Sequence, residues 1–142
     1  MKSIYVSGPL RADTLHKMDL NVRVARDEAE LLWKIGFAVL CPHLNTLNMI
    51  GMLGTDRERN FLEGDLALMK SMDIICMLPG WEDSEGACRE HAEAFSLGMD
   101  CVYRIANNIS PTWNLARKEK EAFVRLSTKW TTVDLMTYAR LT

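Results

Sequence analysis

The sequence predicts a single α/β domain in which helices cover both faces of a parallel sheet. Short apolar segments alternate along the chain with longer segments whose apolar residues recur at helical spacing. The 142 residues are enough for one substantial core, and 48% hydrophobic with 25% charged residues is ordinary for a globular protein. We therefore expect one doubly wound, three-layer domain over residues 1–142, with four or five parallel strands.

Four segments are predicted as strands because they are short, apolar and followed by turn residues. They lie at residues 2–7, 37–41, 73–78 and 101–105. In the first of them, Ile4 and Val6 should point to one face of the sheet and Tyr5 to the other. The second is apolar throughout, which is typical of a parallel strand buried on both faces.

The helical segments follow these strands, which gives the alternation of flavodoxin-like and Rossmann-like sheets. They lie at residues 16–35, 57–72, 84–97, 113–129 and 133–138, so that residues 106–142 form a helical C-terminal extension. Gly36 is expected to end the first helix and Ser84 to cap the third. The first helix should bury one apolar face, made of Leu20, Val22, Ala25, Ala29, Leu32 and Trp33.

Composition argues against several classes of function. With a formal net charge of −2, the chain lacks the excess of positive charge that binds a nucleic acid polymer. No apolar run is long enough for a membrane span or a signal peptide. The four cysteines are scattered, so reduced thiols and a cytoplasmic location are expected. Cys88 with His91, and Cys41 with His43, have ligand-like spacing, but without a C-x-x-C pair we expect no metal site.

Three loops leave the predicted strands at the sheet edge where parallel α/β proteins bind ligands, at residues 7–11, 42–45 and 79–84. Arg11 and Ser84 are suited to grip a phosphate, with Gly8 and Gly86 letting backbone amides approach it. Trp81 is suited to stack on a planar base. Each also has an ordinary interpretation, as a surface arginine, a helix cap or an aromatic covering a core edge.

Two acids are the candidates for bond cleavage. Glu90 lies about two turns into the helix that Ser84 begins, and Asp65 lies on the preceding helix. Two carboxylates are the usual equipment for breaking a glycosidic bond, because one attacks the sugar while the other manages protons. Taken alone, either residue is equally well explained as a surface acid.

Three patterns in the chain together resemble one known superfamily. Residues 84–90 read S-x-G-x-x-x-E, residues 5–11 form an aromatic strand with a glycine turn, and Asp65-Leu66 precedes a Met-Asp-hydrophobic strand start at 72–75. In this order and spacing, over about residues 3–105, they resemble the nucleoside 2-deoxyribosyltransferase superfamily, which includes the 2′-deoxynucleoside 5′-phosphate N-hydrolases. The chain is also similar to short phage and bacterial proteins of unassigned function with a GW..S.GA..E signature.

The resemblance implies a role for each matched position. Glu90 would attack the anomeric carbon, Tyr5 would orient Glu90 by a hydrogen bond, and Asp65 would be the general acid near the departing base. A carboxylate near a helix N-terminus is expected to stay ionised, as a nucleophile must. The remaining site positions would contact the substrate: Ser7, Gly8, Pro9, Arg11, His43, Trp81, Ser84 and Gly86.

Ser84 separates two activities within the superfamily. Transferases acting on free nucleosides tend to have an aspartate six residues before the nucleophile, whereas phosphate-accepting hydrolases have a serine, as here. Ser84 and Arg11 therefore favour a 5′-monophosphate. The acidic neighbours Glu82, Asp83 and Glu85, and Pro9 where the family has a serine, weaken that phosphate pocket.

We therefore expect an N-glycosidase that hydrolyses (deoxy)nucleoside 5′-monophosphates to free base and sugar 5-phosphate, without metal or cofactor. A 2-deoxyribosyltransferase is the close alternative; a nucleotide-binding sensor or sequestering protein and a purely structural protein are alternatives of other classes.

A homodimer or larger assembly is expected, because the family often completes its sites across an interface. The irregular stretch at 45–60 is either a flap over the site or a loop at a subunit contact.

Overall fold

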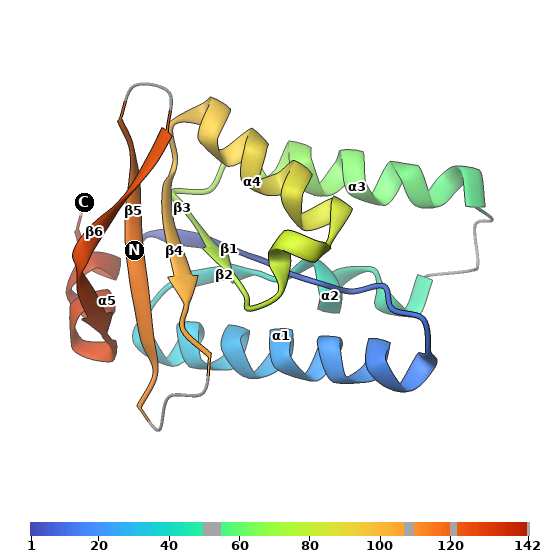
Figure 1. The fold of residues 1–142 in the computed structure, drawn as a ribbon, viewed down its shortest axis with the longest axis horizontal. Coiled ribbons are helices and arrows are strands. Elements are labelled where there is room, and N and C mark those ends of the chain that lie inside the picture. Colours follow the sequence, from blue (N-terminus) through green and yellow to red (C-terminus); the bar gives the residue numbers. More distant parts are fainter. Residues whose placement is uncertain (50–54, 107–109, 120–121, 142) are drawn as a thin grey trace.

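The computed structural model describes residues 1–49, 55–106, 110–119 and 122–141. Within these ranges the strands form one sheet in the order β2-β1-β3-β4-β5-β6 (Figure 1). Their bounds are β1 (Ser3–Ser7), β2 (Ala38–Leu40), β3 (Ile74–Met77), β4 (Asp100–Arg104), β5 (Thr112–Glu119) and β6 (Ala122–Thr131). The first four pair in parallel, as the sequence predicts, whereas β5 and β6 are antiparallel.

Helices follow the parallel strands in the predicted order. They are α1 (Leu15–Ile35), α2 (Pro42–Asn45), α3 (Thr55–Met69), α4 (Glu85–Leu97) and α5 (Thr132–Ala139), with short 3₁₀ turns at Leu47–Met49 and Trp81–Asp83. Gly36 ends α1 with a left-handed φ of 113°, and the Ser84 hydroxyl accepts from Ala87 N at 3.3 Å to cap α4, so both predicted caps are confirmed. No helix in the described ranges is both long and apolar enough to cross a membrane.

Two cores lie on opposite faces of the sheet, which confirms the doubly wound three-layer prediction. Ile4 and Val6 point into the core that also contains residues of α1 and α5. Tyr5 points into the other core, with residues of α3 and α4. Figure 1 shows α1 on one side of the sheet and α3 and α4 on the other. Because β1 lies between β2 and β3, strands are added on one side of β1 and then on the other, and open α/β sheets form their ligand crevice where the strand order reverses in this way.

The predicted helix over residues 113–129 is wrong, because this segment forms the β5–β6 hairpin. The prediction rested on the apolar residues of this segment, Leu115, Ala116, Ala122, Phe123 and Leu126. In the structure Trp113 and Leu115 are fully buried at strand spacing, and β5 pairs with the edge that β4 would otherwise leave open. In the described part of residues 106–142, the one helix is α5, near the predicted short helix at 133–138.

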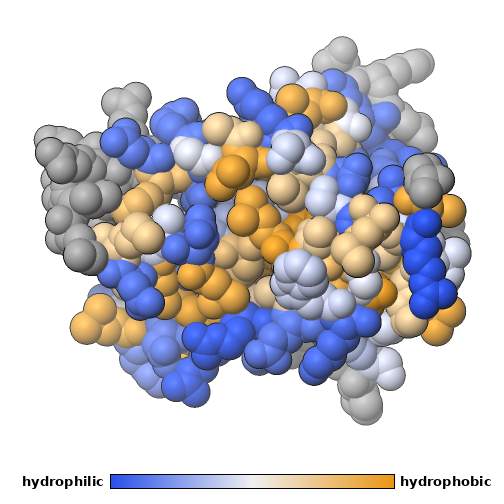
Figure 2. All heavy atoms as spheres, turned by 180° about the vertical axis from the view of Figure 1, so that it is seen from behind, coloured by the Kyte–Doolittle hydropathy of each residue, from blue (hydrophilic) through white to orange (hydrophobic). Residues whose placement is uncertain are grey.

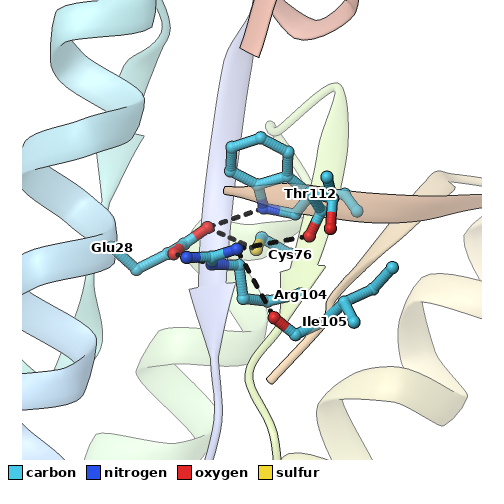
Figure 3. Close-up of polar contacts among 6 residues, drawn as sticks. Glu28, Cys76, Arg104, Ile105 and Thr112 are labelled. Atoms are coloured by element: carbon cyan, nitrogen blue, oxygen red, sulfur yellow. Dashed lines mark hydrogen bonds and ion pairs between the residues drawn. The ribbon is translucent and has the colours of Figure 1, made fainter. Parts of the chain in front are cut away.

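A buried polar cluster joins α1 to this hairpin (Figure 3). The Glu28 carboxylate accepts hydrogen bonds from Trp113 Nε1 at 2.7 Å and from Arg104 Nε at 2.9 Å. The Cys76 thiol also donates to Glu28, at 3.6 Å, and Arg104 Nη1 donates to the Thr112 carbonyl at 3.3 Å. Residues from one helix and three strands therefore meet at one carboxylate that is only 5% exposed.

Strand β2 differs from the prediction of a strand buried on both faces. It is an edge strand, and all three of its residues are half-buried. Trp33 of α1, predicted in the core, is 56% exposed and lines a surface groove of about 480 Å³ beside β2, together with Leu44. Figure 2 shows the molecule from behind, and hydrophobic residues gather across the middle of the face seen in that view. Leu20, also predicted in the core, is exposed as well.

Candidate active site

Glu90 is a buried carboxylate held at both of its oxygens. It is only 7% exposed, on the side of α4 that faces the sheet. The Tyr5 hydroxyl donates to Glu90 Oε1 at 2.7 Å, and the Ser7 hydroxyl donates to Oε2. Tyr5 and Ser7 are two residues apart on β1, so both side chains leave the same face of the strand toward α4. The strand and the helix together fix the orientation of the carboxylate.

Burial acts against the ionised form of Glu90 that its position near a helix N-terminus predicts. Burial raises the pKa of Glu90 to about 7, and the charge of Asp65 adds to this effect. The hydrogen bonds from Ser7 and Tyr5 act in the opposite direction. Near neutral pH the carboxyl group is therefore present in comparable amounts as acid and as carboxylate. Burial and the charge of Glu90 raise the pKa of Tyr5 far above its ordinary value, so Tyr5 remains a hydrogen-bond donor.

A cavity of about 590 Å³ opens over Glu90 at the carboxyl edge of β1. It brings together seven of the residues that the sequence singled out: Gly8, Arg11, His43, Asp65, Ser84, Gly86 and Glu90. Asp65 approaches from α3, and burial raises the pKa of its carboxyl group to about 6. A carboxyl group that keeps a proton at mildly acidic pH can serve as a general acid. The two candidate catalytic acids thus share one cavity.

The cavity wall has mixed charge. Arg11 lies on it, but so do the acids Asp83 and Glu85. His43 Nε2 lies 2.9 Å from the Pro9 carbonyl oxygen, which only accepts, so Nε2 must carry the proton. Burial lowers the pKa of His43, and its buried Nδ1 has no partner among the described residues. A neutral His43 therefore presents one unused acceptor beside the cavity.

Two predicted substrate contacts lie elsewhere. The Trp81 ring stacks on His91 with centroids 4.2 Å apart, and Trp81 packs against the core under α3 and α4. It is not among the described residues that line the cavity over Glu90, so its contact with a base stays a prediction. Pro9 contributes its carbonyl group to His43 rather than its ring to the cavity. Gly8 is required for packing, because a Cβ atom there would lie 2.7 Å from Leu78 Cβ.

Sequence reasoning missed the contact between Ser7 and Glu90 and several wall residues. Ser7 was assigned to the substrate, although its two-residue spacing from Tyr5 would have placed both hydroxyls on one face of the strand. Thr46, Phe61 and Leu62 also line the cavity, and no motif marked them.

Among the described residues, no group of three or more His, Cys, Asp or Glu side chains is arranged to hold a metal ion.

The fold and this cavity define a doubly wound α/β protein with two carboxyl groups at the point where the strand order reverses. The chain belongs to the family described as a domain of unknown function (DUF4406), whose sequence model matches residues 2–103. A solved structure described as a 2-deoxyribosyltransferase from Bacillus psychrosaccharolyticus is similar, with a TM-score of 0.56 and 18% identity over 71% of this chain and 70% of that one. This likeness shows a shared fold. No curated protein matches the chain significantly.

Proposed function

We propose that this protein breaks the N-glycosidic bond of a nucleoside or nucleoside 5′-monophosphate, with Glu90 as the nucleophile. The observation that supports this best is a buried carboxylate, fixed by two hydroxyl groups, in a cavity that also contains Asp65. Two carboxyl groups in one cavity are the usual equipment for breaking a glycosidic bond, one as nucleophile and one as proton donor. The fold shared with a 2-deoxyribosyltransferase is consistent with this chemistry.

The proposed reaction proceeds in two steps. A Glu90 oxygen forms a bond to the anomeric carbon while the bond from that carbon to the base nitrogen breaks, and protonated Asp65 gives its proton to the base. Water then attacks the same carbon, the ester bond breaks with its electron pair returning to Glu90, and Asp65 takes the proton of the water. These steps need no metal or cofactor.

A 5′-monophosphate is the substrate that we propose first. Arg11, Ser84 and Gly86 line the same cavity as Glu90, so a guanidinium group, a hydroxyl group and an unhindered backbone are available for a phosphate. Hydrolysis of this substrate would release free base and sugar 5-phosphate.

Base transfer from a free nucleoside is the second candidate. Asp83 and Glu85 lie on the same cavity wall, and their charges would oppose a phosphate dianion. An uncharged 5′-hydroxyl group would meet no such repulsion. In this reaction a second base, rather than water, attacks the anomeric carbon in the second step.

A chromatographic assay for released base tests the proposal. Purified protein is incubated with ribo- and deoxyribonucleoside 5′-monophosphates, and with the free nucleosides, with and without an acceptor base. Base release from a monophosphate identifies the hydrolase, and exchange that needs an acceptor identifies the transferase. Saturable binding of a nucleotide without turnover would overturn the enzyme proposal in favour of a binding protein, and absence of both would favour a structural role.

A bell-shaped pH dependence of kcat/KM is expected, with its maximum between pH 6 and 7. Below this range Glu90, whose pKa is raised to about 7, becomes protonated and cannot attack. Above it Asp65, whose pKa is raised to about 6, loses the proton that the base needs. Because the two groups interact, the apparent pKa values of the two limbs belong to the pair of carboxyl groups and not to either one alone. Initial rates of base release across pH 4–9 measure it, and activity still rising at pH 9 would contradict these roles.

We also propose that the protein works in the cytoplasm as a homodimer or larger assembly. Its four free cysteines suit a reducing compartment. The groove lined by Trp33 and Leu44 leaves apolar surface uncovered in the single chain. Light scattering at micromolar concentration should give at least twice the mass of one chain, which is 16.2 kDa. A monomeric mass would contradict this expectation.

A further inference from the structure

We propose that Ser7 is a positioning residue, whose hydroxyl group holds the second oxygen of Glu90, stabilises its ionised form and assists its departure from the glycosyl–enzyme. The last of these effects rests on the proposed function. The hydrogen bond and its effect on ionisation do not, because they are properties of the protein without substrate.

Ser7 is placed as a fixed donor. It is the last residue of β1 and is fully buried. Its carbonyl group accepts from Leu78 N at 2.8 Å, and its backbone pairs with Met77 of β3, so the residue cannot shift without disturbing the sheet. A buried hydroxyl group is costly unless it is hydrogen-bonded, and the Ser7 hydroxyl meets this need at Glu90 Oε2.

The two donors on β1 divide the carboxylate between them. The Tyr5 hydroxyl donates to Oε1 and the Ser7 hydroxyl donates to Oε2. Because burial removes water from the carboxylate, each of its oxygens receives one hydrogen bond from the protein instead. Hydrogen bonds to the charged form of an acid favour that form. Loss of the Ser7 hydroxyl group would leave Oε2 without this donor and would make Glu90 hold its proton more tightly.

The other groups around Glu90 do not supply this effect. Asp65 of α3 opposes ionisation of Glu90, since both are acids. Burial raises the pKa of Cys41 to about 11 and lowers that of His43, so both are uncharged near neutral pH. Among the described residues, the other charged groups on the cavity wall are Arg11, Asp83 and Glu85. The hydrogen bonds that favour the ionised form of Glu90 come from Tyr5 and Ser7.

The second step of the reaction depends most on these donors. When Glu90 attacks, its negative charge is used up in the new ester bond, and when the ester breaks the charge returns to the carboxylate. A donor that stabilises the carboxylate therefore lowers the barrier for its departure. Without Ser7, breakdown of the glycosyl–enzyme should become slow relative to its formation.

The experiment compares Ser7→Ala with Ser7→Thr, which keeps a hydroxyl group, and with Ser3→Ala as the matched control. Ser3 is on the same strand and the same face, but its hydroxyl group bonds Asp73 at 3.0 Å instead of Glu90. The ionisation of Glu90 is followed by NMR of protein with ¹³C-labelled glutamate carboxyl groups, with Glu90→Gln identifying the signal. Ser7→Ala should raise the pKa of Glu90 by about one unit, and Ser7→Thr and Ser3→Ala should leave it near the original value.

Kinetics supply the second readout. Ser7→Ala should lower kcat about tenfold or more without raising KM, and mass spectrometry of the quenched reaction should show a glycosylated chain. An unchanged Glu90 pKa in folded Ser7→Ala, or an equal shift in Ser7→Thr, would overturn the proposal. A raised KM with an unchanged Glu90 pKa would instead make Ser7 a substrate contact. A shifted pKa in a protein that releases no base would refute the proposed function while leaving the positioning role intact.

Discussion

Replacing Glu90 by Gln should reduce base release by on the order of 10⁴-fold or more, because the amide oxygen is a poor nucleophile and a poor leaving group. The change is nearly isosteric, so the wall of the cavity should keep its shape. Glu93→Gln is the matched control: it is on the same helix, and its carboxylate faces Lys70, at 3.8 Å, rather than the cavity. Rates of base release for the two variants, at the optimum pH of the unsubstituted protein, measure the effect.

The same substitution should stabilise the fold at neutral and higher pH. In the folded protein the pKa of Glu90 is raised from 4.5 to about 7, so ionising it opposes folding. The gain from Glu90→Gln should be absent below pH 4.5, grow as the pH rises, and reach on the order of 3 kcal/mol above pH 7. Urea unfolding at pH 4.5 and pH 8 measures it. Full activity in Glu90→Gln, or a gain in stability at pH 4.5 as large as at pH 8, would contradict the assignment.

Replacing Glu28 by Ala should destabilise the protein by about 3–5 kcal/mol. The substitution would leave the Trp113 indole N–H buried without its acceptor, and Arg104, whose side chain is only 20% exposed, without its anion. Burial raises the pKa of Glu28, while Arg104 and Trp113 oppose this rise, so the carboxylate and its partners depend on one another. Urea unfolding at pH 7, with Asp27→Ala as an exposed neighbouring control, measures the loss.

The double substitution Glu28→Leu with Arg104→Met distinguishes a missing partner from a missing contact. Because both charges are removed together, we expect this variant to be much closer to the original protein in stability than Glu28→Ala. The Arg104→Met change alone should be destabilising, since it leaves the Glu28 carboxylate buried without its cation. A loss below about 1 kcal/mol in Glu28→Ala would show that the cluster does not hold the hairpin to α1.

The first 105 residues could be interpreted largely from sequence, since their local signals agree with one another. The apolar spacing in residues 15–35 favours a helix, Gly36 favours its end, and the short apolar segments flanking it favour parallel strands. The structure has α1 and the four parallel strands near these positions. Glu90, Asp65 and Tyr5 were singled out by motif spacing, and the structure places Glu90 and Asp65 on one cavity wall with Tyr5 bonded to Glu90. Their catalytic roles remain predictions.

The errors occurred where a distant partner decides the structure. Residues 116–122 favour a helix by propensity, but β4 offers an edge, and burial of Trp113 and Leu115 outweighs that weak local preference. The Trp81 ring also has a neighbour that the sequence did not predict, His91, while its contact with a base stays a prediction. Neither neighbour can be recognised from the spacing of residues along the chain.

The sequence by itself determined the alternation of strands and helices and the residue types at the loops, because these depend on contacts within a few residues along the chain. The tertiary structure alone decided which groups become neighbours across the sheet. It paired Ser7 with Glu90 and joined Glu28 to Arg104 and Trp113. It also raised the pKa of Glu90 to about 7, because desolvation outweighs the hydrogen bonds from Ser7 and Tyr5 that favour the charged form. Desolvation depends on how completely distant segments exclude water, and that quantity exists only once the chain has packed.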